Sequence, residues 1–341
     1  MTPPPPTHPR LVDVAKRAGV SIRTVSNVVN DFPYISTTTR ERVEQAIAEL
    51  GYRPNLIARN LARGRTGLVA LVVPQVAMPY FASLADSMLE ATRDEEMVLV
   101  ISQSRGSHQV ELEALEGRFG QRIDGVVLSP TTLTDADIAQ RRSTIPLVML
   151  GDRTWGGVVT SVGIDHVSAA TEAVRHLIAQ GRRRIAIVGP YLNEEAKRFR
   201  GWAAALREAG IEPDPIWVIG TDGSTGEDGF AAGERLMQMS PRPDAAFFVT
   251  DWLALGAVRA FQRGGLTVPD DVAVVGYDDI PYGRASNPTL TTIRPDRAEI
   301  AHQAVASLVA QRDGDSAPVA IQASWSLVVR ESSGAPATIE A

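Results

Sequence analysis

Polar side chains in the second half of this chain follow short apolar runs, where they could bind a small polar molecule. Arg198 opens a helical pattern soon after one such run, and Asp278 ends another. Thr250 and Asp251 end a third run, and Asp152 ends a fourth. A guanidinium and carboxylates that converge on one cleft can hydrogen-bond the hydroxyls of a sugar or the edge of a base. Helix capping is an equal alternative for Asp251, because it directly precedes a helical pattern.

Other residue types limit the chemistry that we expect. Tyr80 and Phe81 begin a helical pattern and could add aromatic faces to the same cleft, with core packing as the alternative. The chain has 5 His without metal-ligand spacing and 0 Cys, so we expect neither a metal site nor thiol chemistry. No Ser/His pair or phosphate-loop motif is present, and we therefore expect no catalytic residue and no cofactor.

A second candidate for recognition lies near the start of the chain, on a predicted helix after Ser21. The Ser21 hydroxyl is a suitable N-cap, and Val25, Val28 and Val29 form an apolar stripe. The residues left on the outer face are Ile22, Arg23, Ser26, Asn27 and Asn30. This layout is typical of a helix that lies in a DNA major groove, although an ordinary helical hairpin would show a polar outer face too.

Short helices must position this outer face. The spacing predicts helices over Val12–Ala18, stopped by Gly19, and over Thr37–Leu50, capped by Ser36 or Thr37 and stopped by Gly51. A further two-turn helix is possible over Leu56–Arg63, which is too short to be stable alone.

The rest of the chain alternates strand-like runs with helical patterns. The apolar runs are Leu68–Val73, Met97–Ile101, Gly125–Leu128, Pro146–Leu150, Arg184–Val188, Trp217–Ile219, Ala245–Val249 and Val272–Val275. Helical patterns such as 81–93 and 110–122 stand between them. Repeated strand–helix–strand units of this kind predict two doubly wound parallel sheets, buried on both faces, with a ligand cleft between them.

Charge is distributed unevenly along the chain. The net charge is −6, yet residues 1–65 hold ten Lys and Arg against five Asp and Glu. A basic start on an acidic body suggests that the start faces a polyanion. The first nine residues lack the apolar segment of a signal peptide, and no apolar run is long enough to span a membrane. We therefore expect a cytoplasmic protein, associated with the nucleoid.

The chain resembles the lactose-repressor family of bacterial transcription factors from Leu11 to Ser332. The motifs that carry the resemblance are Val12-Asp-Val-Ala15, Ala18-Gly-Val-Ser21, Thr24-Val-Ser26, Val29-Asn30, Thr39-Arg40, Gly51-Tyr52, Pro54-Asn55, Val274-Val-Gly-Tyr-Asp278 and Leu290-Thr-Thr292. The resemblance implies an all-α helix-turn-helix headgroup followed by an α/β core of two doubly wound parallel-sheet subdomains, like type I periplasmic binding proteins. The implied divisions are a disordered arm (1–9), the DNA-binding domain (10–53), a hinge helix and linker (54–66), the core (67–335) and a tail (336–341).

The resemblance also implies roles for single residues. Ile22, Arg23 and Asn27 would read bases in the major groove. The residues that would contact the DNA backbone are Ser21, Thr24, Ser26, Asn30, Tyr52 and Asn55. Leu61, with Ala58 nearby, would wedge into the minor groove. The family commonly has Arg at the position of Asn27, and Asn favours adenine where Arg favours guanine.

In the core, the resemblance implies an effector site. Arg198 and Asp278 match the family's principal effector-binding pair, Tyr80-Phe81 match its aromatic pair, and Thr250-Asp251 stand where Asn-Asp is usual. His166 replaces a frequent Asn, and the region of Ser224 lacks a frequent aromatic residue. These departures leave the effector open between a sugar, a sugar phosphate and a nucleobase-like compound, and a sugar is the family's most frequent choice.

The implied function is that of a homodimeric repressor whose affinity for a palindromic operator is controlled by the effector. The sequence does not show whether the effector is an inducer or a corepressor, or which genes are regulated. One alternative is a periplasmic sugar receptor without DNA function, which would have no use for residues 10–65. An enzyme is a second alternative, and it lacks the motifs named above.

Overall fold

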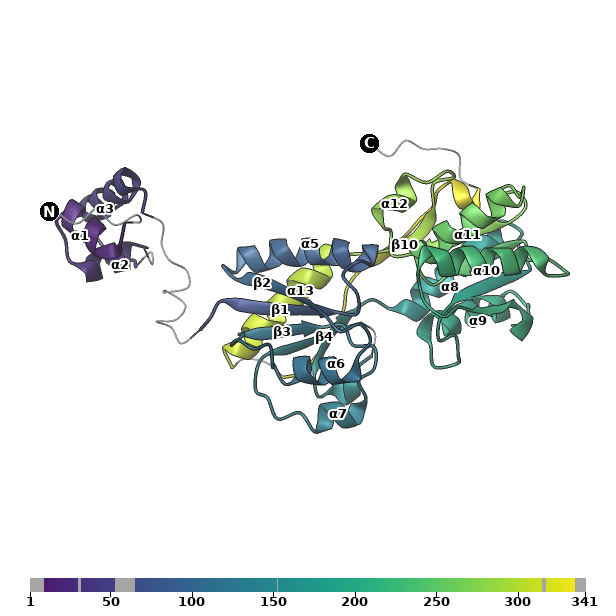
Figure 1. Ribbon diagram of the computed structural model, residues 1–341, viewed down its shortest axis with the longest axis horizontal. Helices are drawn as coiled ribbons and strands as arrows, with labels where there is room; N and C mark the ends of the chain where they lie inside the picture. The colour runs from purple at the N-terminus through teal and green to yellow at the C-terminus, as the bar shows by residue number, and fades with distance from the viewer. Residues whose placement is uncertain (1–8, 30–31, 53–64, 152, 315–316, 335–341) are drawn as a thin grey trace. The chain divides into compact units, whose positions relative to one another are not determined.

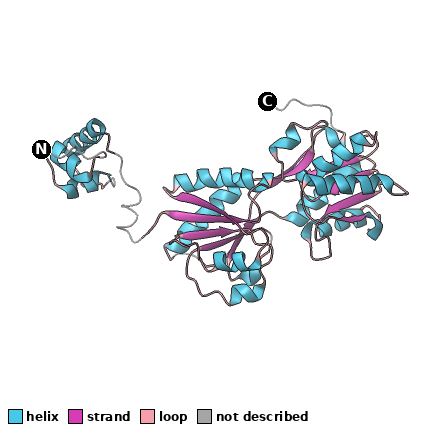
Figure 2. Cartoon of the chain, viewed as in Figure 1, coloured by secondary structure: helices cyan, strands magenta, loops and turns pink. Residues whose placement is uncertain are grey.

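A computed structural model describes residues 9–29, 32–52, 65–151, 153–314 and 317–334 of the 341-residue chain. The chain divides into two compact units, Met1–Gly67 and Leu68–Ala341. As the sequence predicts, the first unit is helical and the second is an α/β structure with two sheets (Figure 2). Within the described ranges, no helix has the length and apolar character needed to cross a membrane.

The described part of the first unit contains three helices, and residues that favour helix ends stand at their boundaries. The helices are α1 (Leu11–Ala18), α2 (Ile22–Val29) and α3 (Thr37–Leu50) (Figure 1). The Ser21 hydroxyl accepts a hydrogen bond from the Thr24 amide at 3.0 Å, and Ser36 caps α3. Gly19 and Gly51 end α1 and α3 with φ of 65° and 63°, a left-handed conformation that glycine adopts without strain.

A small apolar cluster holds these helices together. Val14, Val25 and Val43, one from each helix, are fully buried in it. Tyr52, which directly follows α3 and Gly51, closes the cluster and is 8% exposed. Tyr52 is therefore a core residue of the first unit, and its predicted contact with a DNA backbone remains a prediction.

The second unit contains two six-stranded sheets, each covered by helices. The first sheet has the order β11-β5-β4-β3-β1-β2 and consists of β1 (Leu68–Val73), β2 (Val98–Gln103), β3 (Gly125–Leu128), β4 (Leu147–Leu150), β5 (Thr160–Gly163) and β11 (Ala320–Gln322). The second has the order β12-β10-β9-β8-β6-β7 and consists of β6 (Ile185–Gly189), β7 (Val218–Gly220), β8 (Ala245–Phe248), β9 (Ala273–Tyr277), β10 (Thr291–Pro295) and β12 (Trp325–Val328).

Helices pack on both faces of the first sheet because alternate side chains of a strand point to opposite faces. On β1, Val69 and Leu71 pack in one apolar cluster, whereas Ala70 and Val72 pack in another. The helices of this part are α5 (Pro79–Asp94), α6 (His108–Leu115), α7 (Asp135–Ala139) and α13 (Arg297–Arg312). Figure 1 shows α5 on one side of the sheet and α6 and α7 on the other.

Around the second sheet lie α8 (His166–Ala179), α9 (Lys197–Glu208), α10 (Gly226–Gln238), α11 (Asp251–Arg263) and α12 (Pro281–Arg284). Short 3-10 helices occur at Trp155–Gly157, Pro215–Trp217 and Glu331–Ser333. We call the first sheet with its helices lobe 1 and the second sheet with its helices lobe 2. Within the described residues, the chain crosses between the lobes three times: from β5 to α8, from β10 to α13 and from β11 to β12. Three crossings form the kind of hinge about which two lobes can move.

Some predicted elements differ from the observed ones. The run at 97–101 was expected to be buried on both faces, but β2 is an edge strand whose Val98 is 55% exposed. The helix expected over 110–122 ends at Leu115, because Gly117 turns the chain with a φ of 69°. The second sheet is not wholly parallel, since β12 pairs with β10 in the antiparallel direction.

Candidate functional site

A cavity of about 370 Å³ lies between lobe 1 and lobe 2. Its wall includes residues that directly follow strands of both sheets, among them Pro74, Gly151, Ile164 and Asp278. Parallel sheets bind ligands at the carboxyl ends of their strands, and this cavity has that position in each sheet. Five residues predicted to contact a ligand line it: Tyr80, Phe81, Arg198, Thr250 and Asp278.

Lobe 1 gives the cavity much of its apolar wall. Tyr80 and Phe81 come from the first turn of α5, and their rings contact each other edge to face with centroids 5.2 Å apart. Leu84 lies one turn further along the same helix, and Val162 comes from β5. Burial raises the pKa of Tyr80 to about 12, so its hydroxyl keeps its proton at neutral pH.

Arg198 belongs to the opposite, polar wall, and its position is fixed by lobe 2. It lies in the first turn of α9, and its Nη1 donates to the Val249 carbonyl oxygen at 2.7 Å. Its guanidinium carbon stands 4.0 Å from the centroid of the Tyr277 ring, which is a cation–π distance. These contacts hold the charge at the cavity, where it can meet an acceptor group of a ligand.

Asp278 supplies a carboxyl group to the same wall. It directly follows β9 with a φ of 110°, a conformation that a non-glycine residue rarely adopts. Burial raises the pKa of Asp278 to about 7, although the nearby charges of Arg198 and Arg297 act in the opposite direction. Arg297 also donates from Nη1 to the Asp278 carbonyl oxygen at 2.5 Å, which links the start of α13 in lobe 1 to this residue.

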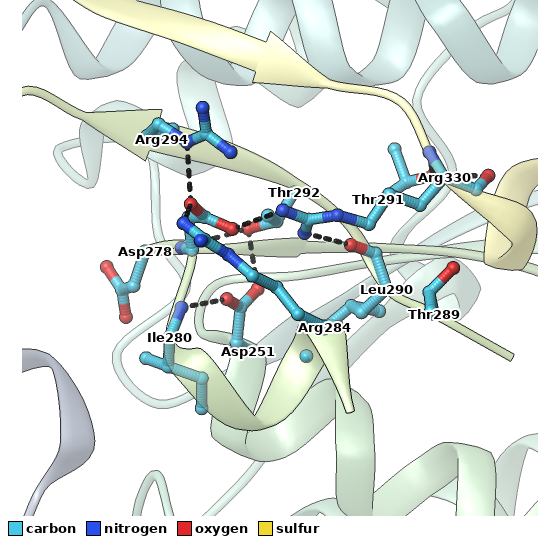
Figure 3. Close-up of polar contacts among 12 residues, drawn as sticks. Asp251, Asp278, Ile280, Arg284, Thr289, Leu290, Thr291, Thr292, Arg294 and Arg330 are labelled. Atoms are coloured by element: carbon cyan, nitrogen blue, oxygen red, sulfur yellow. Dashed lines mark hydrogen bonds and ion pairs between the residues drawn. The ribbon is translucent and has the colours of Figure 1, made fainter. Parts of the chain in front are cut away.

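Asp251 does not line this cavity, and its predicted contact with a ligand stays a prediction. It is fully buried behind the wall, where its carboxylate accepts from the Thr292 hydroxyl at 2.6 Å and from the Ile280 amide at 2.8 Å (Figure 3). Burial raises its pKa well above the usual value, and Asp278 adds to this effect. The residue that caps α11 is Thr250, whose hydroxyl accepts from the Leu253 amide. Asp152, the remaining predicted ligand residue, lies outside the described residues.

Sequence reasoning missed the cluster around Asp279, the residue next to Asp278. Its fully buried carboxylate accepts from Arg284 at 2.9 Å, from Arg294 at 2.6 Å and from Arg330 at 2.8 Å. Figure 3 labels the three arginines. Burial raises its pKa, but hydrogen bonds from the three arginines outweigh burial and lower it to about 2. No spacing in the sequence reveals this cluster, because its members come from separate parts of lobe 2.

His166 is a further cavity residue, and the sequence indicated it only as a departure from a family pattern. It is the first residue of α8, and Asp165 caps that helix. Its Nδ1 lies 2.5 Å from the hydroxyl oxygen of Tyr277. Ser224, the other departure, also lines the cavity. Within the described residues, no group of three or more His, Cys, Asp or Glu is arranged to hold a metal ion.

The first unit presents the second candidate site on α2. Ile22 is 51% exposed, and Arg23 is exposed beside it. Asn27 and Ser26 are partly exposed, while Val25 and Val28 face the core. The hydroxyls of Ser21 and Thr24 hydrogen-bond each other at 2.8 Å near the start of the helix. The predicted DNA contacts Asn30, Asn55, Ala58 and Leu61 lie outside the described residues.

Two families match parts of this chain. Residues 10–55 match the bacterial regulatory proteins of the lacI family, and residues 174–333 match a periplasmic binding protein-like domain. The HTH-type transcriptional repressor CytR of Escherichia coli (strain K12) is 33% identical over 314 residues, 90% of this chain and 91% of CytR. The chain belongs to the lacI family. It is a DNA-binding transcriptional regulator.

Solved structures of lacI-family proteins agree with this fold. The lac repressor dimer bound to operator and the anti-inducer ONPF has a TM-score of 0.79 and 29% identity to this chain. The match covers 96% of this chain and 100% of the lac repressor chain. The complex of the transcriptional regulator CelR with cellobiose has a TM-score of 0.70 and 32% identity, covering 95% of this chain and 100% of its own. The helical start and two-sheet core of this lacI-family regulator therefore match known members over most of its length.

Proposed function

We propose that this regulator is a homodimeric repressor of palindromic operator DNA, controlled by a sugar or sugar derivative in the cavity between lobes 1 and 2. The observation that carries the proposal is the position of the cavity. Arg198 and Asp278 reach it from lobe 2 and Tyr80 and Phe81 from lobe 1. A ligand that contacts both lobes favours one arrangement of the hinge over others, and can thereby change DNA affinity.

The chemistry of the cavity suits a small sugar derivative. Its volume of about 370 Å³ lies at the lower end of ligand-pocket sizes, as a monosaccharide requires. Arg198 donates hydrogen bonds and Asp278 accepts them, while the hydroxyls of Thr250 and Ser224 can do both. Tyr80 and Phe81 can cover the apolar face of a sugar ring. The related CelR was solved with cellobiose, which is consistent with a sugar ligand.

The proposal of a dimer rests on exposed apolar side chains at one edge of lobe 1. These side chains, which we call the β2 surface, are Leu89, Val98 and Ile101, which are 41%, 55% and 40% exposed, with Val98 and Ile101 on opposite faces of the strand. Leu89 lies on α5, and β2 is the free edge of its sheet. Exposed apolar side chains on an edge strand favour association with another chain. The related lac repressor was solved as a dimer on its operator, and we take a second copy as the partner.

The effector proposal can be tested with the full-length regulator. Thermal unfolding is followed with a panel of monosaccharides, sugar acids, sugar phosphates and nucleosides, because a ligand at 100 times its Kd stabilises a protein by about 2.7 kcal/mol. Each compound that stabilises it is then added to an operator gel-shift assay, with the operator obtained by selection from random DNA. We expect a sugar derivative to change operator affinity. Stabilisation by nucleosides alone would contradict the sugar class.

Two variants connect the cavity with the response. Arg198→Ala should bind operator as the unmodified regulator does, yet no longer respond to the effector. Arg175→Ala is the matched control, because Arg175 lies in the same lobe and forms an exposed ion pair with Glu208 at 2.8 Å. An effector response that survives Arg198→Ala would place the effector site elsewhere.

The selection from random DNA also tests the rival class. A sugar receptor without DNA function would enrich no sequence, whereas the proposed repressor should enrich a palindrome. A repressor that binds operator DNA would act in the cytoplasm, at the nucleoid.

A further inference from the structure

His166 and Tyr277 form a pair in the wall of the cavity whose protons can be placed from their contacts. His166 begins α8 at one of the three lobe crossings, and Tyr277 ends β9. His166 Nδ1 and Tyr277 Oη lie 2.5 Å apart, so one of the two atoms donates a proton to the other. Which atom donates decides what the opposite side of the imidazole offers to a ligand.

Arg198 favours one direction of this hydrogen bond. Its guanidinium carbon lies 4.0 Å from the centroid of the Tyr277 ring, and a positive charge there favours a hydroxyl whose proton points away from it. Burial raises the pKa of Tyr277, which keeps the phenol protonated at neutral pH. Among the described contacts of this hydroxyl, His166 Nδ1 is the acceptor available for its proton. Tyr277 therefore donates to His166, and Nδ1 carries no proton.

His166 itself is neutral at physiological pH. Burial lowers its pKa well below the usual value, and the positive charges of Arg198 and Lys197 lower it further. A neutral imidazole has one N–H, and an unprotonated Nδ1 leaves that proton on Nε2. The contacts of the described residues thus fix the tautomer.

Nε2 of His166 has access to open space. It has no hydrogen-bond partner among the described residues. It is not fully buried either, because among those residues the one buried side-chain nitrogen or oxygen without a partner is Nε of Arg182. His166 lines the cavity and also a second one of about 780 Å³. Arg198 and Thr250 line both cavities too, so they adjoin at this point.

We propose that His166 determines effector specificity by presenting a fixed Nε2–H donor beside Arg198, where the two cavities adjoin, to a carboxylate of the effector. This inference rests on the proposed function of the cavity. The Nε2–H of His166 and the guanidinium of Arg198 can only donate hydrogen bonds. A carboxylate oxygen can accept from both and, unlike a hydroxyl, carries no proton. Lys197 and Arg153 of the adjoining cavity add positive charge, and the acidic residues nearby are Glu195 in the wall of that cavity and Asp278 in the wall of the first. The effector class is therefore a sugar acid rather than a neutral sugar.

The tautomer can be tested without any ligand. The full-length regulator is labelled with ¹⁵N-histidine, and the His166 signals are assigned by their loss in His166→Gln. We expect a protonated Nε2 and an unprotonated Nδ1 that do not change between about pH 5.5 and 8, where an ordinary histidine titrates. Tyr277→Phe removes the donor to Nδ1 and should give a mixture of both tautomers. His108→Gln, a change at an exposed histidine of lobe 1, is the control and should leave the His166 signals in place.

A protonated Nδ1 in the unmodified regulator, or an ordinary titration of His166, would overturn the donor assignment. That outcome would leave the proposed control by a sugar derivative intact, since the panel of compounds tests it separately.

The effector class is tested with matched pairs of probes, glucuronate with glucose and galacturonate with galactose. Calorimetric titration should show that at least one acid binds more tightly than its neutral partner. His166→Leu should weaken binding of that acid about tenfold, as expected for one hydrogen bond to a charged group, while His108→Leu should not. Binding of the neutral sugars alone would overturn the carboxylate class and support the proposed function. Binding of none of the four probes would overturn the carboxylate class as well.

Discussion

At the scale of single residues, Asp278 shows what a buried carboxyl group in a ligand cavity does to stability. Its pKa is about 7 in the folded chain and close to the usual value of 3.8 in the unfolded chain. Between these values the folded state keeps a proton that the unfolded state has lost. The contribution of Asp278 to stability is therefore complete below about pH 4 and is lost as the pH rises through about 7.

Asp278→Asn should remove this dependence. An amide does not titrate, and Asn tolerates the φ of 110° at this position at least as well as Asp. We expect the melting temperature of the ligand-free variant to fall less between pH 5 and pH 8 than that of the unmodified regulator. Thermal unfolding across this range is the measurement, with Asp222→Asn on the exposed surface as the control. Equal slopes for Asp278→Asn and the unmodified regulator would contradict the raised pKa.

Arg23 is the second residue whose role can be isolated. It is exposed in the first turn of α2, where a guanidinium can reach the edge of a guanine in the major groove. Arg23→Ala should weaken operator binding by roughly 1–3 kcal/mol and relax the preference at one base pair. Arg17→Ala is the control, since Arg17 lies on α1 and pairs with Glu49 at 2.5 Å. Competition with single-base operator variants measures both effects, and an unchanged base preference would refute the assignment.

At the scale of elements, Asp279 joins several segments of lobe 2. Its carboxylate binds Arg284 at the end of α12, Arg294 on β10 and Arg330, which precedes Glu331–Ser333. Arg330 also donates to the Leu290 carbonyl oxygen at 2.7 Å. Arg284 and Arg294 are partly exposed to water, but the Arg330 side chain is only 6% exposed, so removal of the carboxylate takes an ion-pair partner from a buried guanidinium.

Asp279→Ala should therefore destabilise the regulator by about 3–5 kcal/mol, a loss typical of a broken buried ion pair. Urea unfolding of the full chain measures it. Glu208→Ala removes an exposed ion pair with Arg175 and should cost less than about 1 kcal/mol. If the two variants lose similar amounts of stability, the cluster does not hold these segments together.

The elements also show how far the sequence could predict the fold and the site. Continuous apolar runs predicted β1, β3 and β8 closely, because these strands are buried on both faces. β5 and β10 were missed, since their buried threonines do not form an apolar run. On β10, for example, the Thr291 hydroxyl donates to the Arg330 carbonyl oxygen. Such burial depends on partners distant in sequence, which a local pattern does not contain.

For the candidate site, too, the sequence predicted some residues and could not distinguish others. Positions after predicted strands gave Arg198, Thr250 and Asp278, because strand ends converge wherever parallel strands pair. Asp251 shares that position in sequence with Thr250, yet it points behind the wall toward Thr292. The difference between neighbouring residues is set by helix capping and by the close approach of β9, where Gly276 leaves room for the Asp251 carboxylate. Only the folded arrangement distinguishes the two.

At the scale of the whole molecule, the regulator combines a basic start with an acidic remainder, net +5 for residues 1–65 and −11 for the rest. This asymmetry favours contact of the first unit with DNA and disfavours contact of the second. In the proposed dimer each first unit would contact one half of the palindrome, so operator affinity is expected to depend on whether two copies are joined. The oligomeric state is therefore a direct test of the proposed repression.

The last prediction concerns the β2 surface as the place where two copies join. A variant that combines Val98→Lys with Ile101→Glu places charges on the free edge of the first sheet, and burying them in an interface would be costly. We expect light scattering to show a monomer, with effector binding in the cavity retained. Operator affinity should fall by at least about 100-fold, because the two half-sites would no longer be bound together. A variant with Val158→Lys and Val319→Glu, both also exposed on lobe 1, is the matched control and should remain dimeric. A dimer that survives the change at β2 would show that the copies meet through another surface.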